Sequence, residues 1–390
     1  MKKQIILWVV AACTLVGCMK NKKGNFTLPV NSRADMTEAN LEIDTIRLDS
    51  VVTSYVIETS LRDSVISVLD KYFGVLYRFN LDGSFKEKKL GRGHAKSETS
   101  IGHIATHAFM DNGDLFLLDY SGGHHIYDKD IQMKDFFRVI YENSGDGSLN
   151  KDKLYKTPSE YTHLYNDIVC RSYKNNVYFN VRMSYPMCCY VNNTKQHLEE
   201  NANILEVKLD EQEFGRLLAV GYPDSYQKNS LNKAIFSSVN YDIAKNGDFY
   251  VTYEADTLIY QYDCDYEQKK CFGYAGKDMD LNYRYIKTPK ESGKYWRNER
   301  QTKGYYNWLE YVDETGLLFR SYQKGGTRPV DGLQFYKDGV LIGDVNVPKG
   351  LKVCGYVSPY YYSYVMPNEE REIMYLYRFK SLFKFYLITS

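Results

Sequence analysis

The sequence predicts an all-β protein, namely a six-bladed β-propeller built from four-stranded antiparallel sheets. Aromatic residues make up 15% of the 390 residues, including 38 Tyr and 18 Phe, and aromatic side chains favour strands. Hydrophobic and polar residues alternate at period two over most of the chain, which is typical of half-buried strands. Asn-Gly and Asp-Gly pairs recur between these segments, and tight hairpins need such residues because they adopt positive φ.

The strand and turn signals form a degenerate repeat. One half is a hairpin tip followed by a strand, as in residues 110–119, and the other half reads apolar, aromatic, then Asp or Asn, as in residues 258–263. Successive tips lie 63 to 71 residues apart, at Gly113, Asn176, Gly247 and Gly316. This spacing suits four strands with their loops, and radial repetition of such sheets forms a propeller. The six predicted units lie near residues 52–90, 104–140, 165–220, 238–275, 305–348 and 353–388.

Four segments need separate predictions. The strand expected at 41–48 should complete a sheet made mainly by the C-terminal segment, because pairing the two ends closes the ring. Residues 230–236 and 369–382 have patterns that a short helix would also give. Residues 282–308 lack clean alternation and contain Pro289, so a long loop between blades is expected there.

The N-terminus has the features of a bacterial lipoprotein signal. Lys2 and Lys3 precede an apolar run over residues 5–16, and the small residue Gly17 stands before Cys18. This run is shorter than the roughly 20 apolar residues of a spanning helix, so cleavage before the cysteine is predicted. An ordinary secretory signal that happens to contain a cysteine is the alternative. The expected organisation is a signal peptide at 1–17, a flexible tether at 18–40 and a single propeller domain at 41–390.

The chain resembles the six-bladed β-propeller lipoproteins of Bacteroidetes, a family of mostly undefined function. The resemblance rests on the lipobox ending at Cys18, on residues 89–94 followed by Glu98, and on residues 111–119 leading to residues 126–128. It implies the propeller fold and export of the protein. It supplies no catalytic residue.

The resemblance to bacterial lipoproteins also implies a membrane anchor. The mature chain would begin at Cys18 with a diacylglycerol thioether and an acylated amine, and more than one acyl chain gives stable anchoring. The predicted location is the cell envelope, as an outer-membrane lipoprotein. The family's tag for export to the cell surface is usually acidic, whereas Lys20, Lys22 and Lys23 follow the cysteine here, which favours the periplasmic face.

The charge balance argues against nucleic acid as a partner. The 50 basic and 49 acidic residues give a net charge of +1, so there is no sequence-wide positive field to hold a polyanion. The sequence also lacks a nucleophile elbow, a zinc-protease motif, a P-loop and a dinucleotide fingerprint. We therefore predict no cofactor.

Cysteines and histidines leave two questions open. Cys264 and Cys271 flank six polar residues that suit a hairpin turn, so the two thiols are expected either to form a disulfide or to remain free. Five of the seven histidines lie within residues 94–125, and His103 and His107 would share one face of a strand. Inter-blade hydrogen bonding is favoured over a metal or proton-transfer site, because a set of histidine ligands also needs supporting partners.

The aromatic and basic residues of 282–308 are the candidate ligand-binding residues. Long loops on rigid scaffolds often carry function, and flat amphipathic rings suit stacking on sugars or packing on a protein. The alternative is that these rings fill the seam between two blades. The candidates are Tyr295, Trp296, Arg297, Arg300 and Trp308.

The function predicted from these features is that of a lipid-anchored binding module of the cell envelope, with a glycan or a protein as its ligand. The first alternative is an envelope enzyme, such as a polysaccharide lyase or a glycoside hydrolase, since propellers also host those activities. The second is a structural subunit of an outer-membrane complex. A deep central pocket with converging carboxylates, Arg, His and Tyr would favour an enzyme, whereas a shallow aromatic face would favour binding.

Overall fold

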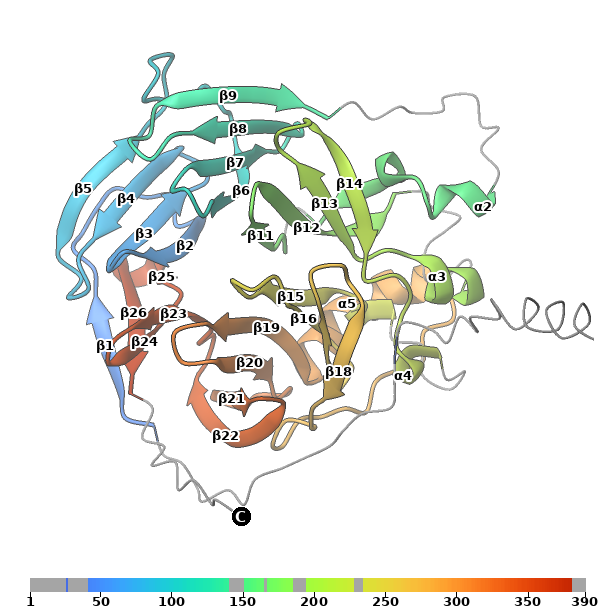
Figure 1. Ribbon diagram of the computed structural model, residues 1–390. Coiled ribbons are helices and arrows are strands. Elements are labelled where there is room, and N and C mark those ends of the chain that lie inside the picture. The colour runs from blue at the N-terminus through green and yellow to red at the C-terminus, as the bar shows by residue number, and fades with distance from the viewer. Residues whose placement is uncertain are drawn as a thin grey trace, which may run out of the picture.

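The computed structural model describes residues 26, 41–139, 151–164, 167–184, 194–227 and 234–380. These residues form six antiparallel sheets arranged radially around a central axis (Figure 1). The fold is therefore the six-bladed β-propeller that the sequence predicts. In blades 1, 2, 4 and 5 the strands pair in chain order, from an innermost first strand to an outermost fourth strand (Figure 1).

The strands are as follows. Blade 1 contains β2 (Ile57–Arg62), β3 (Val65–Asp70), β4 (Val75–Phe79) and β5 (Phe85–Leu90). Blade 2 contains β6 (Ile104–Phe109), β7 (Leu115–Asp119), β8 (Gly123–Tyr127) and β9 (Met133–Arg138). Blade 3 contains β10 (Tyr161–His163), β11 (Cys170–Tyr173), β12 (Asn176–Met183), β13 (Ile204–Lys208) and β14 (Glu213–Leu218). Blade 4 contains β15 (Val239–Ile243), β16 (Phe249–Tyr253), β17 (Ile259–Tyr262) and β18 (Gln268–Phe272). Blade 5 contains β19 (Tyr305–Val312), β20 (Leu317–Gln323), β21 (Val330–Lys337) and β22 (Val340–Pro348). Blade 6 contains β1 (Ile43–Arg47), β23 (Val353–Val357), β24 (Tyr360–Ser363), β25 (Met366–Asn368) and β26 (Ile373–Phe379).

The two ends of the described propeller meet in blade 6. β1 pairs antiparallel with β26, with Ile46 opposite Leu376, so that the first strand of the chain is the outermost strand of the last sheet. Ile46 and Leu48 are buried in the core of this blade. This pairing confirms the prediction for residues 41–48, and it joins the first and last segments of the ring by backbone hydrogen bonds.

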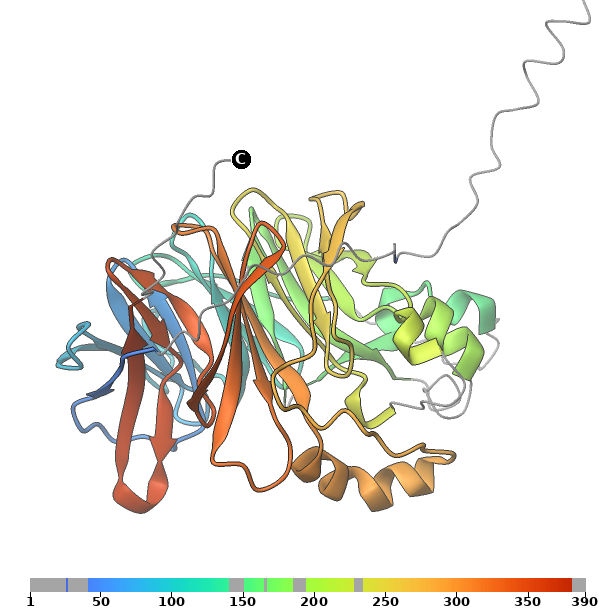
Figure 2. The ribbon, with the colours of Figure 1, turned by 90° about the horizontal axis from the view of Figure 1, so that it is seen from below.

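The prediction of a long loop at 282–308 is wrong for the central part of this segment, which forms a helix, α5 (Pro289–Thr302). Thr288 caps the helix by accepting a hydrogen bond from the Glu291 backbone N–H, and the Glu291 carboxylate in turn accepts one from the backbone N–H of Lys287. Pro289 occupies the first helical turn, where a missing N–H costs nothing. Figure 2 shows α5 lying across one face of the propeller.

The other helices are short. α2 (Lys151–Leu154), α3 (Thr194–Glu200) and α4 (Asp224–Gln227) lie at the outer edge of blade 3 (Figure 1). The helix suggested for 369–382 is wrong: Glu369–Arg371 forms one 3₁₀ turn, Glu372 ends it in the left-handed conformation, and β26 follows. Of the segment 230–236, Ala234–Phe236 forms a 3₁₀ turn and the rest lies outside the described residues.

In the part of the chain that the structure describes, no helix is long and apolar enough to cross a membrane.

Tyrosine side chains fill the seams between blades, which explains part of the unusual composition. Tyr226, Tyr241 and Tyr253 are almost completely buried. The Tyr241 hydroxyl donates to the Val169 carbonyl oxygen at 3.1 Å, and the Tyr253 hydroxyl donates to that of Gly221, also at 3.1 Å. A buried tyrosine thus contributes a large apolar ring and satisfies a backbone carbonyl of the neighbouring blade.

The disulfide suggested between Cys264 and Cys271 does not form, and both thiols are free. Cys271 lies on β18 directly opposite Tyr260 of β17. Cys264 follows the end of β17 and is exposed at the turn, so the register keeps the two residues from facing each other. Cys188 and Cys189 lie outside the described residues.

Candidate functional site

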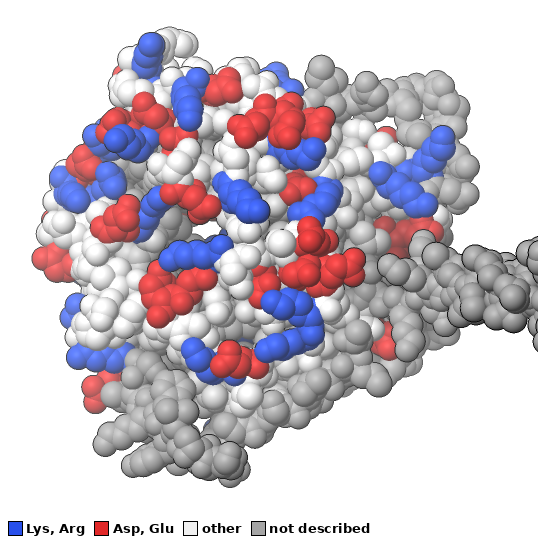
Figure 3. Space-filling view, viewed as in Figure 1, with Lys and Arg blue, Asp and Glu red and all other residues white. Residues whose placement is uncertain are grey.

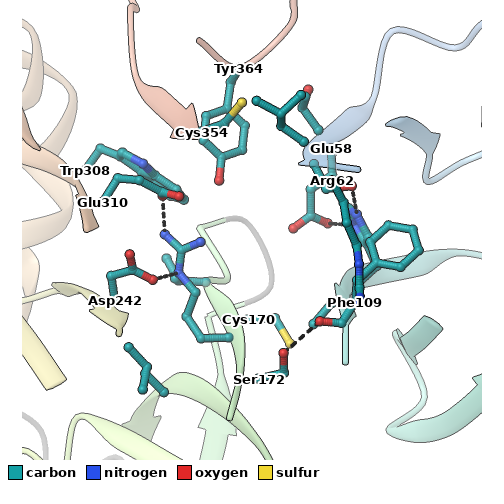
Figure 4. Close-up of a pocket in the computed structure, with 18 of the residues that line it drawn as sticks. Glu58, Arg62, Phe109, Cys170, Ser172, Asp242, Trp308, Glu310, Cys354 and Tyr364 are labelled. Atoms are coloured by element: carbon teal, nitrogen blue, oxygen red, sulfur yellow. Dashed lines mark hydrogen bonds and ion pairs between the residues drawn. The ribbon is translucent and has the colours of Figure 1, made fainter. Parts of the chain in front are cut away.

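The innermost strands of all six blades surround a central cavity of about 270 Å³. In Figure 4, Glu58, Arg62 and Phe109 lie on one wall of this cavity, while Asp242 and Glu310 lie on the opposite wall. Period-two side-chain alternation on each inner strand places every second residue toward the cavity. Polar groups from strands far apart in the sequence therefore converge at the axis.

Arg171 of β11 holds two carboxylates of neighbouring blades on one wall. Its Nε lies 3.0 Å from Oδ1 of Asp242, and its Nη2 lies 2.8 Å from Oε2 of Glu310. The guanidinium carbon is 4.9 Å from the centre of the Trp308 ring. The side chain of Arg171 thereby links blade 3 to blades 4 and 5.

The Arg171 cluster binds a proton near neutral pH. Burial raises the pKa of Glu310 to about 8, although the neighbouring Arg171 acts in the opposite direction. Burial likewise raises the pKa of Asp242. Two carboxyl groups share one guanidinium, so keeping both ionised would leave an uncompensated negative charge in a poorly solvated place.

The opposite wall carries a histidine between a carboxylate and a hydroxyl. Nδ1 of His107 lies 3.2 Å from Oε2 of Glu58, and its Nε2 lies 3.3 Å from Oγ of Ser60. The Thr106 hydroxyl donates to Oε1 of Glu58 at 2.8 Å. Burial alone would raise the pKa of Glu58, but the charge and hydrogen bond of His107, together with Lys71 and Thr106, lower it.

A second cavity, of about 410 Å³, adjoins the central one. The two cavities share six lining residues, among them Glu58, Trp308 and Tyr364. The second cavity is also lined by Asp167, Glu254, Arg300 and Lys352. A third, of about 580 Å³, shares Asp167 with the second and extends to Trp296 of α5. Together, the second and third cavities form what we call the α5-side cleft.

The structure brings three of the five predicted ligand-binding residues to the α5-side cleft. Trp296 is 51% exposed and lines the third cavity, while Arg300 and Trp308 line the second. Arg300 donates to Oε1 of Glu254 at 2.6 Å, and its guanidinium carbon lies 4.0 Å from the centre of the Tyr305 ring. Trp308 belongs to β19 and is partly buried, with its Nε1 donating to the Val353 carbonyl oxygen at 2.9 Å.

The other two predicted residues lie apart from the cleft. Tyr295 is partly buried beneath Arg284, whose guanidinium carbon is 4.2 Å from the ring centre. Arg297 is exposed on the helix. Neither residue lines a cavity of the α5-side cleft.

The histidines that cluster in the sequence do not converge on one metal site in the described structure. His103 precedes β6, so it does not share a strand face with His107, and its ring packs at a tilt against Tyr72 with the ring centres 4.6 Å apart. Burial lowers the pKa of His124 to about 3, and burial lowers that of His163 to about 4. Among the described residues, no group of three or more His, Cys, Asp or Glu residues could hold a metal ion.

The face of the propeller seen in Figure 3 carries acidic and basic side chains interspersed around a small central hollow. Over the described residues of this face, neither sign of charge dominates. This mixed surface agrees with the balanced composition and offers no basic track for a polyanion.

No protein-family model and no curated protein matches the sequence. Among solved structures, a member of the DUF4221 family from Bacteroides vulgatus matches with a TM-score of 0.55 at 10% identity, covering 87% of this chain and 98% of that chain. A candidate exported protein from Bacteroides fragilis has a TM-score of 0.49 at 13% identity, covering 90% and 99% of the two chains. Virginiamycin B lyase from Staphylococcus aureus has a TM-score of 0.43 at 11% identity, covering 87% and 100%. At 10% identity, the likeness to the DUF4221 protein shows the fold alone.

Proposed function

We propose that the protein is a binding module of the cell envelope that takes a glycan in the α5-side cleft. The observation that carries this proposal is the half-exposed Trp296 on α5, beside a cavity lined by polar side chains. Sugars present both apolar C–H faces and hydroxyl groups, so a flat ring next to polar partners suits them.

The surroundings of Trp296 support a preformed site. The Arg300 guanidinium lies 5.9 Å from the Trp296 ring centre and is held by Glu254 on the other side. Burial lowers the pKa of Lys352, and its ammonium lies 5.3 Å from the Trp308 ring centre. These side chains are fixed before any ligand arrives, which reduces the entropy cost of binding.

Replacing Trp296 with alanine should weaken glycan binding by about 1 to 3 kcal/mol, roughly 5- to 150-fold, because the stacking ring is lost. The melting temperature should change little, since the ring is half exposed. A glycan array identifies the ligand. Titration calorimetry then measures its affinity, and scanning calorimetry measures the melting temperature. Tyr285→Ala removes a similarly exposed ring, 47% exposed, that lines no cavity of the cleft, and should leave binding unchanged. A large drop in melting temperature without any glycan hit would instead make Trp296 a packing residue.

An envelope enzyme is the second candidate function. The observation that favours it is the central cavity, where carboxylates, Arg171, His107 and Tyr364 converge from different blades. Asp242 and Glu310 are both bound to one guanidinium on the same wall, whereas a glycoside hydrolase has its two carboxyl groups flanking the glycosidic bond. The carboxylate pair on its own thus does not favour that reaction.

We also propose that lipidation at Cys18 anchors the protein to the outer membrane, with the periplasmic face favoured. The lipobox and the basic residues that follow it support this placement. A glycan-binding module held at a membrane would act on material that passes through the envelope.

Cys18→Ser should move the protein from the membrane fraction to the soluble fraction, or leave an uncleaved precursor, because the thioether cannot form. Fractionation with immunoblotting and intact-mass measurement checks this result. Cys264→Ser, at an exposed free thiol, is the matched control and should remain in the membrane fraction. A processed Cys18→Ser chain that still partitions with detergent would refute the anchor.

A further inference from the structure

We propose that Ser60, His107 and Glu58 form a nucleophilic site for acyl transfer in the central cavity, with esters of small acyl groups as the substrate class. The proposal does not rest on ligand binding at Trp296, which lines the third cavity and not the central one. It assigns a chemical role to the wall of the cavity that faces the Arg171 cluster.

The geometry follows the order nucleophile, base and orienting acid. The Ser60 Oγ lies 3.3 Å from the His107 Nε2, and the other ring nitrogen of His107 lies 3.2 Å from the Glu58 carboxylate. Hydrogen bonds between nucleophile and base are often this long in free enzymes and shorten when substrate binds. Glu58 and Ser60 are two residues apart on β2, so both point toward His107 on β6 of the next blade.

The Glu58 carboxylate is itself held in place. Its Oε1 accepts a hydrogen bond from the Thr106 hydroxyl, and its Oε2 lies within ion-pair distance of His107, 3.2 Å from Nδ1. The factors that lower the pKa of Glu58 keep it ionised. A negative charge beside Nδ1 favours the imidazole tautomer that carries its proton on that nitrogen, and the Nε2 of this tautomer can accept a proton from serine.

The solvent exposure of the His107 and Ser60 side chains distinguishes this arrangement from an ordinary contact between blades. The side chain of His107 is only 3% exposed, whereas Ser60 is partly exposed and lines the cavity. The base is thus shielded from water while the nucleophile faces an open space of about 270 Å³. A hydroxyl that served only to join two blades would not need to face that space.

The facing wall of the same cavity carries a cationic side chain, Arg171. Arg171 uses Nε and Nη2 to bind Asp242 and Glu310. Within the described part of the chain, its Nη1 makes no hydrogen bond. A fixed cationic donor in a poorly solvated site stabilises negative charge that develops on a carbonyl oxygen.

The reaction balances without a further reactant besides water. The Ser60 Oγ attacks the ester carbonyl carbon, and its proton passes to the His107 Nε2. The bond from that carbon to the alcohol oxygen then breaks, and the alcohol leaves with the proton from His107. Water attacks the acyl-serine in the same way, releasing the carboxylic acid and returning the proton to Ser60.

The test uses the full chain with a fluorophosphonate probe, which reacts with activated serines, and with p-nitrophenyl acetate as an ester. We expect one equivalent of probe, mapped by mass spectrometry to Ser60, and complete loss of labelling in Ser60→Ala. His107→Gln should slow labelling at least tenfold. Ser172→Ala is the control, because Ser172 lines the same cavity but donates its hydroxyl proton to the Phe109 carbonyl oxygen, and its labelling should match wild type.

Glu58 is a positioning residue, so its test includes rescue by a conservative variant. Glu58→Gln should slow labelling, because the imidazole loses the carboxylate beside its Nδ1, and Glu58→Asp should restore part of the rate. Thermal melts confirm that each variant is folded. No labelling of the wild-type chain, or equal labelling of Ser60→Ala, overturns the proposal and leaves the Trp296 prediction untouched.

Discussion

Replacing Arg320 with leucine is expected to lower the free energy of unfolding by about 3 to 5 kcal/mol. Arg320 has no exposed surface. Its guanidinium donates to Gln334 and to the carbonyl oxygens of Thr257 and Tyr274 at 2.6 to 3.0 Å. Leucine fills part of the volume but removes a donor from each of these acceptors, and an unsatisfied buried acceptor costs about 1 to 3 kcal/mol.

Urea unfolding followed by circular dichroism measures this loss. The matched control is Arg328→Leu, because the Arg328 side chain is 47% exposed and only 3.6 Å from Asp278 in a surface ion pair. The control should change stability by less than about 0.5 kcal/mol. Equal unfolding midpoints for wild type and Arg320→Leu would show that the bonds between blades 4 and 5 contribute little.

Most of the fold could be predicted because its signals are local. Alternation at period two and a Gly or Asn at the tip determine each hairpin within about 20 residues, as at Gly113 and Gly247, which both have positive φ. The pairing of β1 with β26 is not local, but it follows from the need to close a ring whose last sheet lacks an outer strand. The six predicted units accordingly overlap the six observed sheets.

The predictions for 282–308 and 369–382 failed because each segment contains sequence signals for two different secondary structures. Pro289 predicts a loop, yet proline is also favoured in the first turn of a helix. Thr288 with Glu291 gives the capping pattern that selects the helix. In β26, the partial alternation of Met374, Leu376 and Phe379 competes with a helical spacing. Pairing with β1 selects the strand.

Some residues of the candidate site could be predicted from the sequence and others could not. Trp296 and Arg300 could be predicted because their segment is conspicuous in composition. Glu58, His107 and Arg171 could not, because each is an ordinary polar residue of an alternating strand and only the closed ring brings them together. The signal that could have found them is that a charged residue on a largely buried inner strand needs a polar partner, which the neighbouring blades supply once the ring is closed.

The second large effect is expected at Arg171, and it should depend on pH. Arg171→Met leaves Asp242 and Glu310 without their common cation, and breaking such a pair costs about 3 to 5 kcal/mol when the remaining charge stays buried. The pKa of Glu310, about 8 in the folded protein, already lies above its value in the unfolded chain. Such a group stabilises the fold fully below its unfolded pKa, and that contribution is lost as the pH rises through about 8.

Removing the guanidinium raises both carboxyl pKa values further, so the variant should lose stability more steeply than wild type as the pH rises. We expect a deficit of about 1 kcal/mol at pH 5, where Glu310 is protonated, and about 4 kcal/mol at pH 8. Urea unfolding of wild type and Arg171→Met at each pH measures this difference in stability. Lys245→Met breaks an exposed pair with Glu314, where the side chains are 71% and 50% exposed, and should give a small deficit that is the same at both pH values. A deficit for Arg171→Met that is independent of pH would mean that packing of the side chain, not its charge, joins blade 3 to blades 4 and 5.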